Sequence, residues 1–254
     1  MKTLVFSDIH GNALALDAML DDARDETFDA MVCLGDAVQS GPQPAETVSR
    51  LRELACPVVM GNADDWLLSG EDSGAEQIAS ERMVKMNAVR DWSLEQLSRN
   101  DLEFIRSFQS TVRLPLADGL ELICSHGSPK SFDDVILPTI DDEKLRTLLE
   151  PQTGCLYCGG HTHVQFVRHL RDMFHFNPGS VGYAYRHEQR FDVPLIRSDP
   201  FAEYAVLTTG KGRVRLEFRR VPLNVERLAE VYRSSGRPFV EEAIRQFEFD
   251  VNMC

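Results

Sequence analysis

Short apolar runs alternate with helical patterns through the first sixty residues. Residues 3–6, 30–34 and 57–60 are apolar runs of strand length. Apolar side chains recur at helical spacing over residues 16–23, and a second helical pattern over residues 44–54 begins at a proline. Strands that alternate with helices predict βαβ units and a largely parallel sheet.

The pattern changes in the rest of the chain, where hairpins become frequent. One hairpin is predicted around Asp118 and Gly119, and a second around the glycines at 210 and 212. Apolar and charged residues alternate over residues 213–218, which predicts one buried face. Further strands are expected over 156–158, 166–170 and 173–176, and helices over about 75–108, 141–150 and about 224–249.

These segments predict one α/β domain over residues 1–254. We find neither an internal repeat nor a low-complexity linker in the sequence. The arrangement that fits is two mixed sheets that face each other, with helices outside, a helical flank at about 75–108 and C-terminal helices at about 224–249. A chain of this length is ample for a large buried core.

Composition narrows the class of protein. The formal net charge is −13, whereas proteins that grip DNA or RNA usually carry a basic face, so nucleic acid is an unlikely partner. The sequence shows neither an apolar run long enough to span a membrane nor a signal peptide at its start. We therefore expect no membrane partner and a cytoplasmic location, while the oligomeric state stays open.

The six cysteines are expected to be reduced. Four of them lie in or beside apolar strand-like runs and are interpreted as small buried side chains. Cys155 and Cys158 form a CxxC pair, which is typical of redox or metal sites. Because a second CxxC is missing from the sequence, the favoured interpretation is a strand that carries two thiols.

Five polar clusters each follow an apolar run, and together they suggest a metal site. They are Asp8-Ile9-His10, Gly35-Asp36, Gly61-Asn62-Ala63-Asp64, His126-Gly127 and Gly160-His161-Thr162-His163. In α/β folds the ligand crevice lies beyond the carboxyl ends of the strands, so these clusters should converge on one edge. Taken singly, each cluster is more often a turn or a surface feature. Four of the seven histidines fall in these clusters, which makes coincidence a poor explanation.

The residue types indicate which ions would bind. Imidazole with carboxylate favours Mn, Fe, Co, Ni or Zn over Ca or Mg. An extended backbone at Asp8-x-His10 and at His161-x-His163 would send both side chains of each pair to the same face. Each pair can then ligate the same group of ions. His169, His175 and His187 are interpreted as ordinary histidines.

The order of these clusters resembles that of the calcineurin-like metallophosphoesterases, most closely the small prokaryotic phosphodiesterase-type members. The resemblance runs from about residue 1 to residue 183 and includes Gly41-Pro42 and Asn177-Pro178-Gly179-Ser180-Val181. It implies a four-layer α/β/β/α sandwich with two divalent ions at one edge. It also implies hydrolysis of a phosphate ester, with a small molecule or nucleotide as substrate.

The resemblance further implies a ligand for each position. One ion would be held by Asp8, His10, Asp36 and His163, and the other by Asp36, Asn62, His126 and His161. Asp36 would bridge the two ions, and Asp36, Asn62 and Asp64 would take part in catalysis. Asn62 and Arg186 would contact the substrate, and Tyr183 or Tyr185 could stack on a base. The favoured alternative for residues 183–186 is a solvated loop with two packing tyrosines.

One position departs from the family pattern. Many relatives carry a histidine where this chain has Ala63, and that histidine can protonate the leaving group. Alanine transfers no proton, so substrates with an acidic leaving group should react best. Three other functions remain open: a protein phosphatase, a nuclease, and a catalytically silent metal-binding scaffold.

Overall fold

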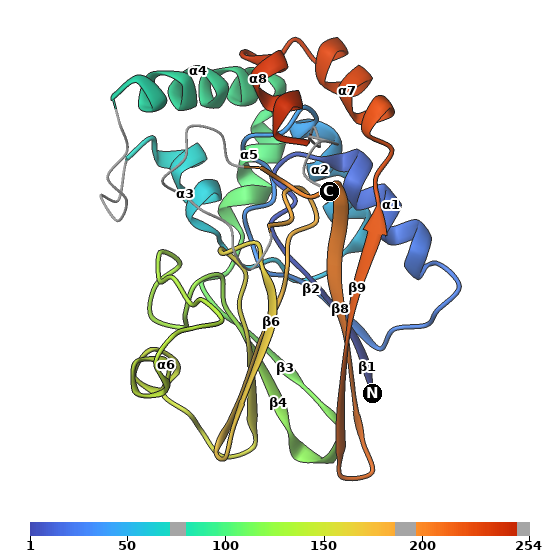
Figure 1. Ribbon diagram of the computed structural model, residues 1–254, viewed down its shortest axis with the longest axis vertical. Coiled ribbons are helices and arrows are strands. Elements are labelled where there is room, and N and C mark those ends of the chain that lie inside the picture. Colours follow the sequence, from blue (N-terminus) through green and yellow to red (C-terminus); the bar gives the residue numbers. More distant parts are fainter. Residues whose placement is uncertain (72–79, 186–196, 248–254) are drawn as a thin grey trace, which may run out of the picture.

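Two mixed β-sheets lie face to face in the computed structural model, which describes residues 1–71, 80–185 and 197–247 (Figure 1). The first sheet has the order β2-β1-β8-β9, with β1 at Lys2–Phe6, β2 at Ala30–Cys33, β8 at Phe201–Gly210 and β9 at Arg213–Pro222. β1 is parallel to β2 and antiparallel to β8, which pairs with β9 as the predicted hairpin. The largely parallel sheet expected from the first sixty residues is therefore a mixed one.

The second sheet has five strands in the order β3-β4-β5-β7-β6. Its strands are β3 (Val112–Pro115), β4 (Glu121–Cys124), β5 (Cys155–Cys158), β6 (Gln165–Leu170) and β7 (Met173–Pro178). β4, β5 and β7 are mutually parallel, whereas β3 and β6 are antiparallel to their neighbours. The hairpin predicted around Asp118 and Gly119 is confirmed, with a short 3-10 turn η1 (Ala117–Gly119) at its tip.

Alternating side chains of β1 divide the core between the layers. Leu4 and Phe6 pack with α1 (Ala13–Ala23), α2 (Pro44–Leu54) and α5 (Arg99–Arg106) on the outer face of the first sheet. Val5 points the other way and packs between the sheets with Leu122 and Phe176. These side chains are fully buried. On the far face of the second sheet, Leu145 and Leu149 of α6 (Asp142–Leu149) pack on Ile123 and Tyr157. The layers are thus α/β/β/α, as expected.

The remaining helices gather at one end of the molecule. They are α3 (Asn62–Ser69), α4 (Ser80–Gln96), α7 (Val225–Ser234), α8 (Val240–Ile244) and the 3-10 turn η2 (Arg245–Phe247). Figure 1 shows α4, α7 and α8 at the end opposite the N-terminus, toward which the carboxyl end of β1 points. Within the described residues, no helix is both long and apolar enough to cross a membrane.

The structure corrects two local expectations and resolves a third. Residues 57–60 form only single bridges, from Val58 to Cys33 and from Val59 to Gln109, instead of a strand. α3 was not predicted, because its first residues were interpreted only as a polar cluster. The two cysteines of the CxxC pair lie three residues apart on β5, so they point to opposite faces. Cys158 is instead paired in register with Cys124 of β4.

The apolar face of β9 is less buried than the alternating pattern of residues 213–218 predicts. Val214 is 40% exposed, while Leu216 and Phe218 are only partly buried against the core between the sheets. β9 is the edge strand of its sheet, so a neighbour on only one side covers these residues.

Candidate metal centre

The predicted ligand residues converge at one edge of the two sheets. Each follows the carboxyl end of a strand or opens a helix: Asp8 and His10 follow β1, Asp36 follows β2, Asn62 opens α3, His126 follows β4, and His161 and His163 follow β5. The arrangement follows from the parallel pairing of β1 with β2 and of β4 with β5.

The backbone at these residues is left-handed, which corrects the extended conformation expected for the two His-containing pairs. φ is positive at five of the residues: Asp8 (54°), His10 (50°), Asp36 (49°), His161 (67°) and His163 (56°). Residues other than glycine adopt this region at a cost of about 1–3 kcal/mol each, so surrounding contacts must hold them there. Such strain is concentrated at functional sites, and here it falls on the side chains that converge.

The first group consists of Asp8, His10, Asp36 and His163, each of which offers one ligand atom within 4.8 Å of the others. His10 Nε2 lies 3.0 Å from His163 Nε2 and 3.7 Å from Asp36 Oδ2. His163 Nε2 lies 3.4 Å from Asp8 Oδ1. All four residues are buried.

The second group consists of Asp36, His126 and His161, with Asn62 beside it. His126 Nε2 lies 3.4 Å from Asp36 Oδ2 and 3.0 Å from Asn62 Oδ1. The rings of His126 and His161 have centroids 5.1 Å apart. Asp36 therefore belongs to both groups.

Backbone carbonyls orient three of the imidazole rings from behind. Nδ1 of His10 lies 3.1 Å from the Gln39 carbonyl, Nδ1 of His126 lies 2.8 Å from the Leu34 carbonyl, and Nδ1 of His163 lies 2.9 Å from the Tyr183 carbonyl. Because a carbonyl only accepts, each Nδ1 must donate a proton. This is the arrangement in which Nε2 serves as a metal ligand.

The hydrogen bonds of His10 and His163 explain why a cation fits between their rings. With Nδ1 protonated on both rings, the Nε2 atoms of His10 and His163 face each other at 3.0 Å as two lone pairs. Two acceptors at that separation repel unless a cation or a proton lies between them, and carboxylates surround the point. The donor set therefore suits a divalent ion of intermediate hardness.

The charges of the cluster reinforce one another. Burial alone would raise the pKa of Asp36, but His126 and His10 outweigh burial and lower it. Burial alone would lower the pKa of His126, yet the Asp36 carboxylate raises it to about 10. Burial, joined by repulsion from His126, lowers the pKa of His161 to about 4. The two carboxylates thus stabilise positive charge where the ring nitrogens meet.

Asp64 lies behind the cluster instead of in it. Its carboxylate is fully buried and accepts hydrogen bonds from the backbone N–H groups of Ala37, Val38 and Gly61 at 3.0–3.3 Å. These bonds tie the segment after Asp36 to the start of α3. Asp64 is expected to take part in catalysis, and these contacts support a positioning role for it.

The segment Asn177–Ser180 supports the cluster from the other side. Asn177 Nδ2 donates to the Gly160 carbonyl at 2.6 Å, and Ser180 Oγ donates to the Asp8 carbonyl at 2.8 Å. A Cβ at Gly160 would lie 2.0 Å from Ser7 Oγ and 2.8 Å from Asp8 Oδ2, so only glycine fits there. The sequence motif pointed to this segment, but not to its role.

Three further residues singled out in the sequence can now be placed. Ala63 is half-buried, and its backbone N–H donates to Asp36 Oδ1 at 2.8 Å. Tyr183 is buried against Phe247, and Tyr185 stacks on His163 with ring centroids 4.7 Å apart. Tyr183 is therefore a buried packing residue, whereas Tyr185 is only partly buried. Arg186, the expected substrate contact, lies outside the described residues.

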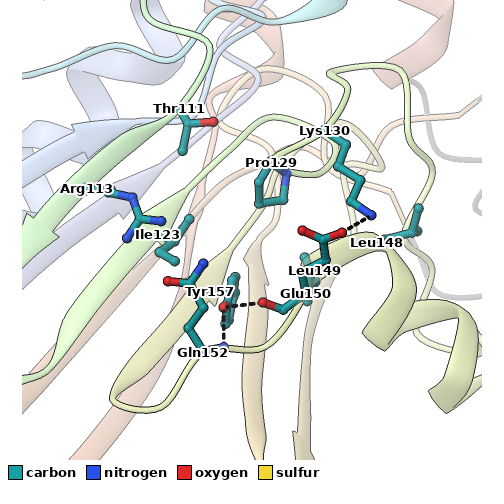
Figure 2. A pocket seen from close by; sticks show the side chains of 10 residues that line it. All are labelled: Thr111, Arg113, Ile123, Pro129, Lys130, Leu148, Leu149, Glu150, Gln152 and Tyr157. Atoms are coloured by element: carbon teal, nitrogen blue, oxygen red, sulfur yellow. Dashed lines mark hydrogen bonds and ion pairs between the residues drawn. The ribbon is translucent and has the colours of Figure 1, made fainter.

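A separate cavity of about 240 Å³ lies between the second sheet and α6 (Figure 2). Arg113, Lys130 and Tyr157 are among its lining residues, and none of the predicted ligands is. Both of its cations are already paired, Lys130 with Glu150 at 2.6 Å and Arg113 with Glu121. We therefore place the chemistry at the Asp and His cluster and not in this cavity.

Comparison with known proteins agrees with this geometry. Residues 1–198 match the calcineurin-like phosphoesterase superfamily domain. Uncharacterized protein MJ0912 of Methanocaldococcus jannaschii is 28% identical over 221 residues, which cover 76% of this chain and 85% of that protein. Phosphodiesterase YfcE of Escherichia coli is 25% identical over 191 residues, which cover 71% of this chain and 79% of that enzyme.

A solved structure extends the similarity over nearly the whole chain. The crystal structure of a metallophosphoesterase from Sphaerobacter thermophilus is 26% identical, with a TM-score of 0.68, and the match covers 96% of this chain and 97% of that one. The family match spans more than half of the chain and includes every predicted metal ligand. The chain therefore belongs to the calcineurin-like phosphoesterase superfamily.

Proposed function

We propose that this protein hydrolyses a phosphate ester of a small molecule or nucleotide at a centre of two divalent ions. The observation that carries the proposal is the position of Asp36, whose carboxylate belongs both to the group with Asp8, His10 and His163 and to the group with His126 and His161. Two neighbouring cations repel, and a shared carboxylate offsets that repulsion. Membership in a phosphoesterase family supports the hydrolase activity.

The proposal assigns each ligand a site. Asp8, His10, Asp36 and His163 hold the first ion, and Asp36, Asn62, His126 and His161 hold the second. The mixture of imidazole and carboxylate donors favours Mn, Fe, Co, Ni or Zn. When bound, the two ions supply the positive charge that polarises a phosphoryl group and lowers the pKa of water.

Asn62 and Ala63 determine how the phosphoryl group is contacted and which leaving groups depart. Asn62 stands at the first turn of α3, half-buried, with its amide oxygen beside His126. Its amide can therefore meet the phosphoryl group at the edge of the cluster. Ala63 next to it transfers no proton, so departure of the leaving group depends on that group's own acidity. Aryl esters and phosphoanhydrides meet this condition.

The domain boundaries are also proposed. We propose residues 1–254 as a single domain, because the core between the sheets joins side chains from both of them, among them Val5 and Leu207 of the first sheet and Leu122 and Phe176 of the second.

The function is tested by assaying metal-reconstituted protein on three substrates. An aryl phosphodiester, an aryl phosphomonoester and a dinucleoside polyphosphate, each with Mn²⁺, separate a diesterase, a phosphatase and a pyrophosphohydrolase. We expect metal-dependent turnover of at least one of them. A protein that binds two ions yet turns over none of the three would instead be the catalytically silent scaffold.

A further inference from the structure

The C-terminal helices contact the backbone that orients His163. The hydroxyl of Tyr232, on α7, lies 2.6 Å from the hydroxyl of Tyr183. The carbonyl of the same Tyr183 accepts the Nδ1 proton of His163 at 2.9 Å. The ring of Tyr183 also stacks on Phe247, with centroids 5.5 Å apart. It makes a T-shaped contact with the ring of His10, with centroids 5.4 Å apart.

The same helical segment reaches His10 by a second route. Arg237, in the turn between α7 and α8, donates from Nε to the Ser40 carbonyl at 2.6 Å. The preceding carbonyl, that of Gln39, accepts from Nδ1 of His10 at 3.1 Å. Ser40 has a φ of 95°, which lies in the left-handed region and must be held there by contacts. Arg237 is one such contact.

Both routes end at the first group of ligands. His10 and His163 belong to the group with Asp8 and Asp36, and their Nε2 atoms face each other at 3.0 Å. The second group is held by other contacts, which do not involve the C-terminal helices. His126 is held by the Leu34 carbonyl, and Asp36 accepts from the Ala63 N–H. These supports come from the N-terminal quarter of the chain.

The packing makes this segment a rigid support. Tyr232 is fully buried, and Phe247 and Tyr183 are 2% and 6% exposed. They form one apolar cluster with Leu228, Ala243 and Ile244. The guanidinium of Arg237 lies 5.8 Å from the Tyr232 ring, so the two contact residues also touch each other. The matched family region ends at residue 198, before these helices begin.

We propose that Tyr232 and Arg237 are positioning residues that set the affinity of the first ion site and leave the second site unaffected. The inference rests on the ligand assignment in the proposed function. Tyr232 acts through Tyr183 on His163, and Arg237 acts through Ser40 and Gln39 on His10. Groups that orient metal ligands typically change metal affinity by about 10–100-fold when they are removed.

The test titrates Mn²⁺ into metal-free protein and measures heat and stoichiometry. We expect two sites in the wild type. In Tyr232→Phe and in Arg237→Gln, one site should weaken by about tenfold or more, while the other keeps its affinity. Arg237→Lys retains a donor for the Ser40 carbonyl and should recover part of the loss.

Two further variants separate positioning from general loosening of the fold. Tyr204→Phe removes the hydroxyl of another fully buried tyrosine, bonded to Asp22 on the outer face of the first sheet, and should leave both affinities unchanged. Tyr183→Phe breaks the same hydrogen bond as Tyr232→Phe. The two single variants should lose equal affinity, and the double variant should lose no more than either.

Three results would overturn the inference. Two sites of unchanged affinity in both Tyr232→Phe and Arg237→Gln would leave the proposed function intact and refute the positioning role. Equal weakening of both sites, in step with a lower thermal midpoint, would show a merely structural role. A wild type that binds no ion would refute the proposed function and this inference together. If Tyr232→Phe fails to fold, the comparison of Arg237→Gln with Arg237→Lys decides alone.

Discussion

The Oδ2 atom of Asp36 lies 3.4 Å from Nε2 of His126. The same oxygen lies 3.7 Å from Nε2 of His10, which belongs to the other ligand group. A carboxylate held between two sets of imidazoles is the arrangement that a pair of cations needs, since one anion offsets the charge of both.

Chelation should abolish hydrolysis, and Mn²⁺, Ni²⁺ or Co²⁺ should restore it better than Mg²⁺. The reason is the set of ligands, which contains four imidazoles and two carboxylates. Mg²⁺ prefers oxygen ligands and usually keeps several bound water molecules. The measurement is the initial rate on an aryl phosphodiester after chelator removal and addition of each ion. Full recovery with Mg²⁺ alone would contradict the assignment of the histidines as ligands.

The rate should fall steeply as the pKa of the leaving group rises, because Ala63 donates no proton. General acid catalysis contributes on the order of 10²–10⁴-fold, so its lack should be slight for nitrophenyl esters and severe for alkyl esters. A series of phosphodiesters with graded leaving groups measures this. A flat dependence would show that another group supplies the proton.

Ala63→His tests the same point from the other side. The variant should raise the turnover of alkyl esters and leave that of nitrophenyl esters nearly unchanged. The neighbouring carboxylate of Asp64 could orient such a histidine, but its oxygens already accept from the N–H groups of Ala37, Val38 and Gly61. We therefore expect a gain smaller than the roughly 10²–10⁴-fold of a fully oriented general acid.

Asp64→Ala should lower both the stability of the protein and its metal affinity. The variant leaves buried N–H groups without their acceptor, at a cost of about 1–3 kcal/mol, and frees the segment that carries Asp36. Asp101→Ala is the control, since Asp101 accepts from the Ser98 N–H in the capping box that begins α5, at a partly exposed position outside both ligand groups. The control should lose stability only. Equal metal affinity in both variants would contradict the positioning role.

Stability should fall on acidification because of His175. This side chain is 1% exposed, and among the described residues neither ring nitrogen has a hydrogen-bond partner. Burial, with Arg168 adding repulsion, lowers its pKa from 6.5 to about 3. Between pH 6.5 and about pH 3, His175 is protonated in the unfolded chain and neutral in the folded protein. The free energy of unfolding therefore falls as the pH drops below 6.5.

His175→Leu should remove this loss. At pH 5 the wild type should have lost about 2 kcal/mol relative to pH 8 through this residue, and the variant should not. Urea unfolding of both proteins at the two pH values measures the difference. Parallel pH dependence in the two proteins would show that His175 is not the group responsible.

The convergence of the ligands could be predicted from the sequence, because it depends on local features. Asp8, Asp36 and His126 each follow an apolar run of strand length, and parallel strands end at a common edge. The layers could be predicted for the same reason. Leu4, Val5 and Phe6 form a continuous apolar run, which indicates that both faces of the strand are covered.

The parts that the sequence did not predict depend on contacts between distant residues. The left-handed backbone at His161 and Asp36 is held by the surrounding structure and not by local propensity. The carbonyl that orients His126 belongs to Leu34, 92 residues away. The support from Tyr232 requires the packing of a helix whose amphipathic pattern indicates only that one face is buried.

The central claim is that Asp36 joins two ions in one hydrolytic site. The most direct measurement is the metal content of reconstituted wild type and Asp36→Asn by elemental analysis, with the rate of aryl phosphodiester hydrolysis measured on the same samples. Asp21→Asn, at an exposed position of α1, is the control. We predict two ions per chain in the wild type and in the control. Asp36→Asn should hold fewer than two ions and lose nearly all activity. A wild type with one ion, or an Asp36→Asn variant that keeps both its ions and its rate, would contradict the account.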